Sequence, residues 1–333
     1  MNCSLRSWHA LTLLLVCALL GWLPKSEAAD VVCTATMTNV DFGSVDLING
    51  TGLTTSATLT YSCTNNNPSN QTYARVCFDA GDGVESSGYA NPRVMKDSAG
   101  NMLQFQLFQG SGFTTVWGSQ FSSTTSSPYF VDLVFAKGGT VTGSVSFQGR
   151  LVAGQTNVPP GSYQDQFTGN YTAITVNENA GNPPTTCSST ATSTFPFSAK
   201  AVVSKSCIVT ATNLDFGSQN FTANNVAAAV NGAVTVTCSN STPYTVGLSP
   251  NSTGSTVGTG TMAGTGGNTD KVPYQLYANA GLTSVWGNIS GTNTIAGVGT
   301  GAAQPALPVY GKLPSANFTP DAYRDTVTVN VVY

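Results

Sequence analysis

The sequence has little charge and almost no histidine, and both shortages exclude functions. Only 8% of its 333 residues are charged, against about 25% in an average protein. The one histidine is His9, which lies in the leader described below. The mature chain therefore cannot form a Ser-His-Asp triad, a Cys-His dyad or a histidine-ligated zinc site. The net charge is −3 with no basic run, and phosphate binding needs clustered lysine and arginine, so we expect no nucleic-acid partner.

Long apolar runs are also scarce. Arg6 precedes the apolar stretch Leu11–Leu20, which is too short to span a bilayer, and Ser26-Glu27-Ala28 resembles a small-residue cleavage site. We therefore expect residues 1–28 to be a signal peptide and the mature chain to begin near Ala29. No later stretch approaches the roughly 20 apolar residues that a membrane-spanning helix needs.

Glycine, serine, threonine and asparagine take the place of the missing charges, and aromatic residues make up 9% of the chain. Ala57–Tyr61 and Ala233–Thr237 alternate apolar and polar residues, as strands with one buried face do. Turn-forming residues separate many such runs, and no helical apolar period lies between them. This pattern predicts an all-β protein of antiparallel sandwiches.

An internal repeat divides the chain into two copies. Thr38–Ser44 recurs as Thr212–Ser218, with a cysteine five positions before the motif Thr-Asn in each copy. Further pairs follow in the same order: Gln106-Leu107-Phe108 with Gln275-Leu276-Tyr277, Val116-Trp117-Gly118 with Val285-Trp286-Gly287, and Tyr163-Gln164-Asp165 with Tyr323-Arg324-Asp325. Such ordered self-similarity indicates a tandem duplication of one domain.

The repeat also predicts how the cysteines pair. The six cysteines outside the leader allow fifteen connectivities, but equivalent positions should pair equivalently. We therefore expect disulfides Cys33–Cys63 and Cys207–Cys238, which leaves Cys77 and Cys187 to join within the first domain. Disulfides imply an oxidising compartment, and the absence of C-x-x-C spacing argues against a metal site.

The two copies differ at their ends. Copy two finishes with the alternating strand 326–333, whereas copy one is followed by a second alternating run. We expect that run to close the first domain with five residues on one face: Phe195, Phe197, Ala199, Ala201 and Val203. The second domain is expected to lack this last strand. The predicted organisation is a first domain at 29–190, a linker with the closing strand at 191–206, and a second domain at 207–333.

These motifs resemble the spore coat protein U domain family, which includes subunits of archaic, Csu-type chaperone–usher pili. The resemblance rests on Asp41-Phe42-Gly43 after a cysteine, on the Gln-Leu-Phe and Val-Trp-Gly segments, and on the Tyr-x-Asp strand of each copy. It implies incomplete immunoglobulin-like sandwiches, each completed by a donor strand from a neighbour. Thr194–Ala201 resembles such a donor strand, but it lies between the two domains.

From this placement we expect a pilus-tip adhesin that acts in cell attachment and biofilm formation. Between Ala29 and Cys33 there are too few residues for a donor strand, so the chain should accept a strand without giving one. The implied partners are a periplasmic chaperone, an outer-membrane usher, an adjacent pilin and an abiotic surface or host receptor. The implied location is the cell surface, reached through the periplasm. The alternatives are a structural spore-coat or matrix protein and, with the least support, a two-carboxylate hydrolase.

Residues in both copies are expected to serve the fold: Trp117 and Trp286 as packing residues, and Asp41 and Asp215 in turns. Residues in copy one alone are candidates for surface binding, and they fall in four loops. These residues are Ile48, Leu53, Tyr89, Phe121, Tyr129, Val158, Pro159 and Pro160. The sequence suggests no catalytic residue, metal ligand or cofactor site.

Overall fold

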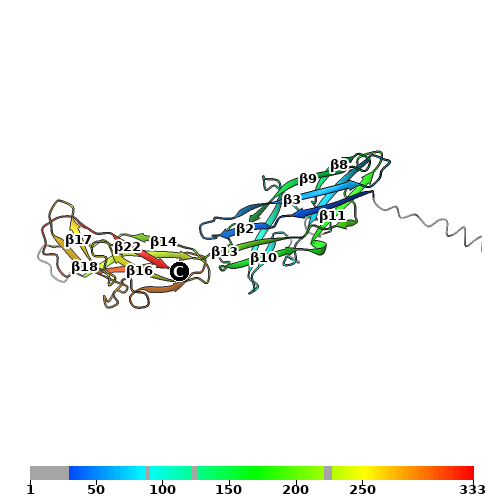
Figure 1. Cartoon of the computed structure of the whole chain (residues 1–333). Coiled ribbons are helices and arrows are strands. Elements are labelled where there is room, and N and C mark those ends of the chain that lie inside the picture. The colour runs from blue at the N-terminus through cyan, green and yellow to red at the C-terminus, as the bar shows by residue number, and fades with distance from the viewer. Residues whose placement is uncertain (1–29, 87–90, 122–126, 221–226) are drawn as a thin grey trace, which may run out of the picture.

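The computed structural model describes residues 30–86, 91–121, 127–220 and 227–333. These residues form β-strands and one short 3-10 turn, η1 (Gly169–Tyr171). They are arranged as two β-domains that follow one another end to end (Figure 1). The chain is therefore an all-β protein of two domains, and residues 204–206 connect them.

The first domain packs two sheets around one core. Its larger sheet has the order β1-β3-β9-β6-β5-β10-β13-β2, and the smaller has the order β12-β11-β4-β8. The strands are β1 (Val31–Met37), β2 (Val40–Val45), β3 (Thr54–Asn65), β4 (Thr72–Ala80), β5 (Arg93–Lys96), β6 (Met102–Gln109), β7 (Thr115–Val116), β8 (Tyr129–Phe135), β9 (Thr140–Leu151), β10 (Gly161–Phe167), β11 (Thr172–Asn179), β12 (Ala191–Ser193) and β13 (Phe197–Val203).

The second domain repeats this plan with fewer strands. Its sheets have the orders β14-β15-β20-β18-β17-β21 and β19-β16-β22. The strands are β14 (Cys207–Thr212), β15 (Ala227–Cys238), β16 (Pro243–Pro250), β17 (Thr259–Gly264), β18 (Lys271–Tyr277), β19 (Ile295–Val298), β20 (Leu307–Lys312), β21 (Tyr323–Arg324) and β22 (Val327–Val332).

The residues that the two copies share do serve the fold. Trp117 and Trp286 are fully buried, and each indole Nε1 donates to a carbonyl on the opposite sheet, that of Phe78 at 2.8 Å and that of Val246 at 3.0 Å. The carboxylates of Asp41 and Asp215 each accept the backbone N–H two residues later and so fix a turn. The packing and turn roles predicted from the repeat are confirmed.

Three disulfides form, with the pairing that the repeat predicts. Cys33–Cys63 and Cys207–Cys238 each join the first strand of a domain to its neighbour in the sheet, β1 to β3 and β14 to β15. Cys77–Cys187 instead connects β4 to the loop between β11 and β12, 110 residues away. A cross-link over so long a loop removes the most entropy from the unfolded chain.

The first domain also buries charged groups, which the sequence pattern does not predict. Arg93 is fully buried, and its guanidinium donates to the carbonyls of Ala80, Gly81 and Trp117 at 2.7–2.8 Å. Asp165 is fully buried as well and accepts from the backbone N–H of Glu85 at 2.8 Å. Burial raises the pKa of Asp165 to about 6, an effect that its hydrogen bonds only partly offset.

The long-range disulfide should set the stability of the first domain. We expect replacement of both Cys77 and Cys187 by alanine to lower its free energy of unfolding by about 2–5 kcal/mol. The transition of the second domain should not move. Urea unfolding monitored by a probe in each domain would measure both effects, and Cys207→Ala with Cys238→Ala is the reciprocal control. An unchanged first transition would contradict this assignment.

The buried carboxyl should make the first domain less stable as pH rises. The pKa of Asp165 is higher in the folded than in the unfolded state, so the folded protein holds this proton more tightly. The stability from this group is complete below about pH 4 and is lost as pH rises to about 6, at a cost of up to about 3 kcal/mol. Asp165→Asn should reduce this slope in unfolding measured from pH 4 to 7, and the part that remains comes from Asp79, whose pKa burial also raises.

Asp97→Asn is the control for this measurement. Hydrogen bonds from the Asn101 amide hold the pKa of Asp97 below its usual value. Its contribution to stability is therefore lost only as pH falls below about 4. If the slope between pH 4 and 7 is unchanged in Asp165→Asn, another group carries it.

Candidate functional site

The first domain is closed by β13, the strand that follows it in the sequence. β13 pairs antiparallel with β10, from Gly161 opposite Val203 to Phe167 opposite Phe197, and parallel with β2. The residues predicted to face the core do so, each with at most 4% of its surface exposed: Phe195, Phe197, Ala199, Ala201 and Val203. Phe195 lies just before the strand. This segment supplies both backbone pairing and core side chains.

Aromatic contacts anchor the start of this closing segment. The ring of Phe197 stacks on that of Phe167, with centroids 4.4 Å apart and planes at 6°. Phe195 meets Phe78 edge-on at 6.1 Å and lies parallel to Trp117 at 5.9 Å. Fully buried aromatic residues dominate the energy of a core. The closing segment is therefore an integral part of the first domain.

The equivalent space in the second domain is open. Two adjoining cavities of about 700 and 540 Å³ lie there. Both are lined by Leu214, Asp215, Phe216, Met262 and Tyr323. We call this combined space the groove. It lies between segment 214–219 and β21, the counterparts of the strands β2 and β10 that flank β13 in the first domain.

The two flanks of the groove lose their strand structure. Segment 214–219 has no strand, although its counterpart β2 has six residues. β21 has two residues, although its counterpart β10 has seven. In the first domain both flanks pair with β13. The loss of strand structure at the groove therefore follows from the lack of a strand between its flanks.

Side chains along the groove are more exposed than their counterparts. Val40, Phe42 and Tyr163 have 1–6% of their surface exposed in the first domain. In the second domain Leu214, Phe216 and Tyr323 occupy the matching positions, and all three are only half-buried. An apolar face of this kind, flanked by backbone groups outside a sheet ladder, is a site for an added strand.

The polar groups of the groove also differ from those of the first domain. Asp165 is held by Glu85 and Ser86, which belong to a segment that only copy one contains. Its counterpart Asp325 lines the groove and accepts from the hydroxyls of Tyr274 at 2.7 Å and Ser252 at 2.6 Å. These bonds fix the carboxylate at the wall, so it remains paired while the groove is open.

The structure does not bring the eight predicted surface-binding residues together. The loops with Ile48 and Leu53 and with Val158, Pro159 and Pro160 lie at the end of the first domain that faces the second. Asn49 Nδ2 donates to Ser206 Oγ at 3.0 Å, and Asn240 Nδ2 donates to Asn157 O at 2.6 Å. Val158 is also part of the core. These five residues therefore lie at the end where β13 leaves the first domain, and their role in surface binding stays a prediction.

The other three predicted residues lie elsewhere. Phe121 is 44% exposed and follows Gln120, whose N–H donates to Asp79 at 2.7 Å. Tyr129 begins β8 and packs its ring against Phe78 and Phe147. Tyr89 lies outside the described residues. Phe121 therefore remains exposed, whereas Tyr129 is largely a packing residue.

The sequence interpretation missed the loops at the opposite end of the first domain, which we call the distal end. β3 ends there, β4 and β9 begin there, and the end points away from the second domain (Figure 1). Its three loops are 66–71, 136–139 and 180–190. Most of the exposed residues are polar, and they include Asn66, Ser69, Asn70, Gln71, Lys137 and Asn182. The longer asparagine-rich loop of copy one was the available signal.

Buried amides hold the distal end in one shape. Asn65 is fully buried, and its Nδ2 donates to the carbonyls of Asn70 and Ala136 at 3.0 and 3.2 Å. Asn67 Oδ1 accepts from the backbone N–H groups of Ser69 and Asn70. The loops 66–71 and 136–139 are therefore fixed to each other before any ligand binds, and such preorganisation reduces the entropic cost of binding.

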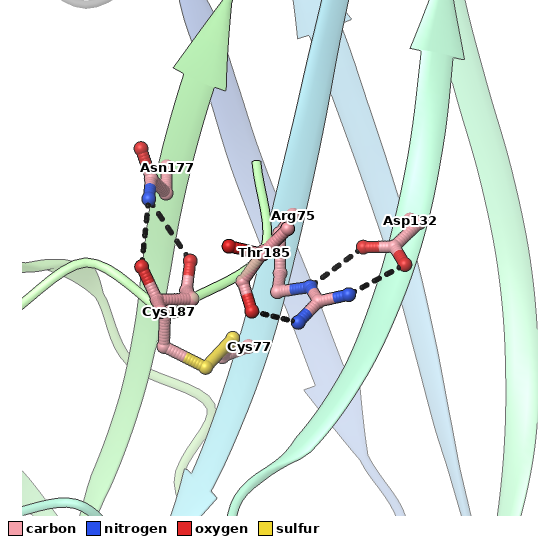
Figure 2. A network of polar contacts seen from close by, with 7 residues as sticks. Arg75, Cys77, Asp132, Asn177, Thr185 and Cys187 are labelled. Atoms are coloured by element: carbon pink, nitrogen blue, oxygen red, sulfur yellow. Dashed lines mark hydrogen bonds and ion pairs between the residues drawn. A yellow bond between two sulfur atoms is a disulfide. The ribbon is translucent and has the colours of Figure 1, made fainter. Parts of the chain in front are cut away.

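The third distal loop is fastened across the outer face of the smaller sheet (Figure 2). The disulfide holds Cys187 to Cys77 of β4, and Asn177 Nδ2 donates to Thr186 O at 2.9 Å. Arg75 donates to Thr185 O and forms a two-pronged ion pair with Asp132 of β8 at 2.7 and 2.8 Å. Loop 180–190 is thus a covalently fixed part of the surface.

Two further findings concern the described residues. Among them no group of three or more histidine, cysteine, aspartate or glutamate side chains is placed to hold a metal ion. In the described part of the chain, no helix has the length and the apolar character needed to cross a membrane.

Several solved structures are similar to this chain. The chaperone-bound tip adhesion subunit CsuE, from the archaic chaperone–usher Csu pili of Acinetobacter baumannii, is 18% identical with a TM-score of 0.52, and the match covers 91% of this chain and 100% of that chain. The CupB6 tip adhesin from Pseudomonas aeruginosa is 10% identical with a TM-score of 0.37, covering 90% and 93%. The first match supports the fold of both domains.

The sequence itself shows the family. No curated protein sequence matches the chain. The model of the spore coat protein U domain, however, matches residues 25–170 and again residues 191–330. The two matched segments correspond to the two copies of the repeat and together span most of the chain, so this chain belongs to the spore coat protein U domain family.

Proposed function

We propose that this chain is the tip adhesin of a chaperone–usher pilus. The first domain contacts a surface or receptor, and the second accepts a donor strand from the next subunit. One observation carries the proposal: the space that β13 fills in the first domain is an open groove in the second. A tip subunit needs this combination, since its outer domain must be complete and its inner domain must receive the fibre.

The groove has the chemistry that a donor strand requires. Half-buried apolar side chains, among them Leu214, Phe216 and Val329, form its floor and walls. The backbone of segment 214–219 is outside any sheet ladder. An inserted strand would gain main-chain hydrogen bonds on both sides and bury alternate apolar side chains, as β13 does in the first domain.

The same groove argues for further partners. An exposed apolar groove with free strand edges promotes aggregation, so the second domain needs a protecting chaperone before assembly. The similar CsuE was solved as a complex with the chaperone CsuC. We propose a periplasmic chaperone as the first partner of this chain, an outer-membrane usher as the exporter, and the pilus tip at the cell surface as the final location.

The distal end is the proposed adhesive surface, in cell attachment and biofilm formation. Most of its exposed side chains are amides and hydroxyls, with one lysine and a few small apolar residues, and Asn65 and Asn67 hold the loops in a fixed shape. This chemistry suits a hydrophilic receptor such as a host glycan better than an apolar abiotic surface. Self-polymerisation into a coat or matrix is disfavoured, because β13, the donor-like segment in the described chain, is already paired within the first domain.

A donor peptide should stabilise the second domain alone. As the probe we choose residues 193–204 of this chain, whose segment closes the first domain. At a hundredfold excess over its Kd the peptide should add about 2.7 kcal/mol to the stability of the second domain. That corresponds to a rise of about 10 °C in the second thermal transition of the full-length protein.

Two controls make this result specific. A peptide with Phe195 and Phe197 replaced by aspartate should have no effect. The variant Leu214→Arg, which places a charge in the groove, should abolish the response to the unaltered peptide. If the unaltered peptide does not raise the midpoint temperature of the second thermal transition, the strand-accepting role is contradicted.

The distal end should determine attachment. We expect the triple variant Asn66→Ala, Asn70→Ala, Gln71→Ala to reduce attachment of pilus-bearing cells to glycan-coated surfaces at least fivefold. Its side chains are exposed, and the shape of the loop is held by Asn65 and Asn67, so folding should be retained. Equal surface display must be verified with an antibody.

The matched control replaces three exposed residues of the second domain, Ser284, Ser290 and Thr292, by alanine. Attachment of these cells should equal that of the wild type. If the distal variant also attaches normally, the adhesive surface lies elsewhere on the first domain.

A further inference from the structure

We propose that the loop between β20 and β21, residues 313–322, docks the body of the next subunit in the fibre. That subunit is a β-domain of the same repeat, whose donor strand leads directly into its own first strand. This inference rests on the proposed strand-accepting role of the second domain. It adds a contact surface beyond the groove.

The junction between the two domains provides the template. β13 completes the first domain at Val203, and β14 of the second domain begins at Cys207. The second domain therefore has the same relation to the first domain as a following subunit has to the subunit that it completes. In both cases the strand that leads into one domain fills the gap of the domain before it. The contacts across this junction show how the body of a strand-giving domain sits on a strand-accepting one.

The template contact is made by the loop between β9 and β10. Asn240 Nδ2 of the second domain donates to Asn157 O at 2.6 Å. Gly301 has a φ of +77° and packs against the carbonyl of Thr156 so closely that a Cβ would not fit. The receiving loop therefore offers a backbone carbonyl, and the incoming domain supplies an amide side chain and a glycine.

The second domain carries the same loop in the same shape. In the first domain Tyr163 OH donates to Pro159 O four residues earlier, and in the second Tyr323 OH donates to Thr319 O four residues earlier. This shared bond aligns the loops residue by residue. The counterparts of Thr156, Asn157 and Val158 are Ala316, Asn317 and Phe318.

These counterparts are accessible, and Phe318 is more exposed than the residue it matches. Asn317 is exposed and Ala316 is half-buried, as Asn157 and Thr156 are in the first domain. Phe318 is half-buried and lines the groove, whereas its counterpart Val158 is 7% exposed. At Phe318 the loop thus exposes apolar surface that is buried at Val158 in the first domain, while Asn317 is as exposed as Asn157.

The direction of a donor strand leads to this loop. β13 runs parallel to β2, and its last residue, Val203, lies opposite Gly161 at the start of β10. A strand in the groove with the same direction would end beside Asp321, the counterpart of Gly161. The chain that follows it would enter its own body next to Ala316 and Asn317.

The test uses the full-length protein with Asn317→Trp, which places a bulky side chain on the docking loop. Ser290→Trp, on a separate exposed loop of the second domain, is the matched control. One measurement is the thermal shift caused by the 193–204 peptide, which needs the groove alone. The other is the amount of this chain in fibres sheared from cells that assemble the whole pilus.

We expect Asn317→Trp to keep the full peptide response and to lose at least fivefold in incorporation, while Ser290→Trp matches the wild type in both. A photo-crosslinking residue at position 317 should form a crosslink to the next subunit. The crosslinked site should be the loop of that subunit that corresponds to the Asn240 loop of this chain, which follows Cys238. Normal incorporation of Asn317→Trp, or a crosslink elsewhere, overturns the docking surface. If the peptide response is absent in the wild type, the strand-accepting role itself fails. Asn317→Glu replaces Asn317→Trp if the latter does not fold.

Discussion

Strand pairing on both sides of one gap is the constraint on which both domains depend. In the first domain β13 lies between β10 and β2, where it completes two hydrogen-bond ladders and carries five buried side chains. Removing a strand from such a place would leave backbone groups unpaired and aromatic residues exposed, and either change is costly. The closure of this gap therefore separates a finished domain from a receptive one.

The second domain keeps almost everything except that closure. It retains the tryptophan that spans the two sheets, the disulfide between the first two strands and the aspartate turn. The tryptophan and the disulfide are not among the residues that line the groove, so the fold persists while the groove flanks stay short. The contacts that stabilise the second domain and the groove that accepts a strand are thus different parts of the domain. The domain can therefore stay folded before a donor strand binds.

The sequence predicted the features that a repeat or a strict period encodes. Alternation from Phe195 to Val203 identified the closing strand, and the spacing of Cys33 and Cys63 against Cys207 and Cys238 predicted the disulfides. The placement of loops could not be predicted, because it depends on where β13 leaves the first domain. The same limit hid Arg93, which reads as a surface residue until the carbonyls of Ala80, Gly81 and Trp117 are brought around it.

The distal end and the groove place opposite physical demands on the chain, and the two copies meet them with different additions. A surface that must bind under load benefits from being fixed in advance, and copy one provides this with buried amides, the Arg75–Asp132 ion pair and the Cys77–Cys187 disulfide. A groove that must admit a strand cannot be fixed in this way. Copy two has no counterpart of Cys77 or Cys187, and its groove carboxylate is held by hydroxyls at the wall. The first domain therefore differs from the shared fold at the distal end, where we propose that it contacts a surface. The second domain differs at the groove, where we propose that it receives the next subunit.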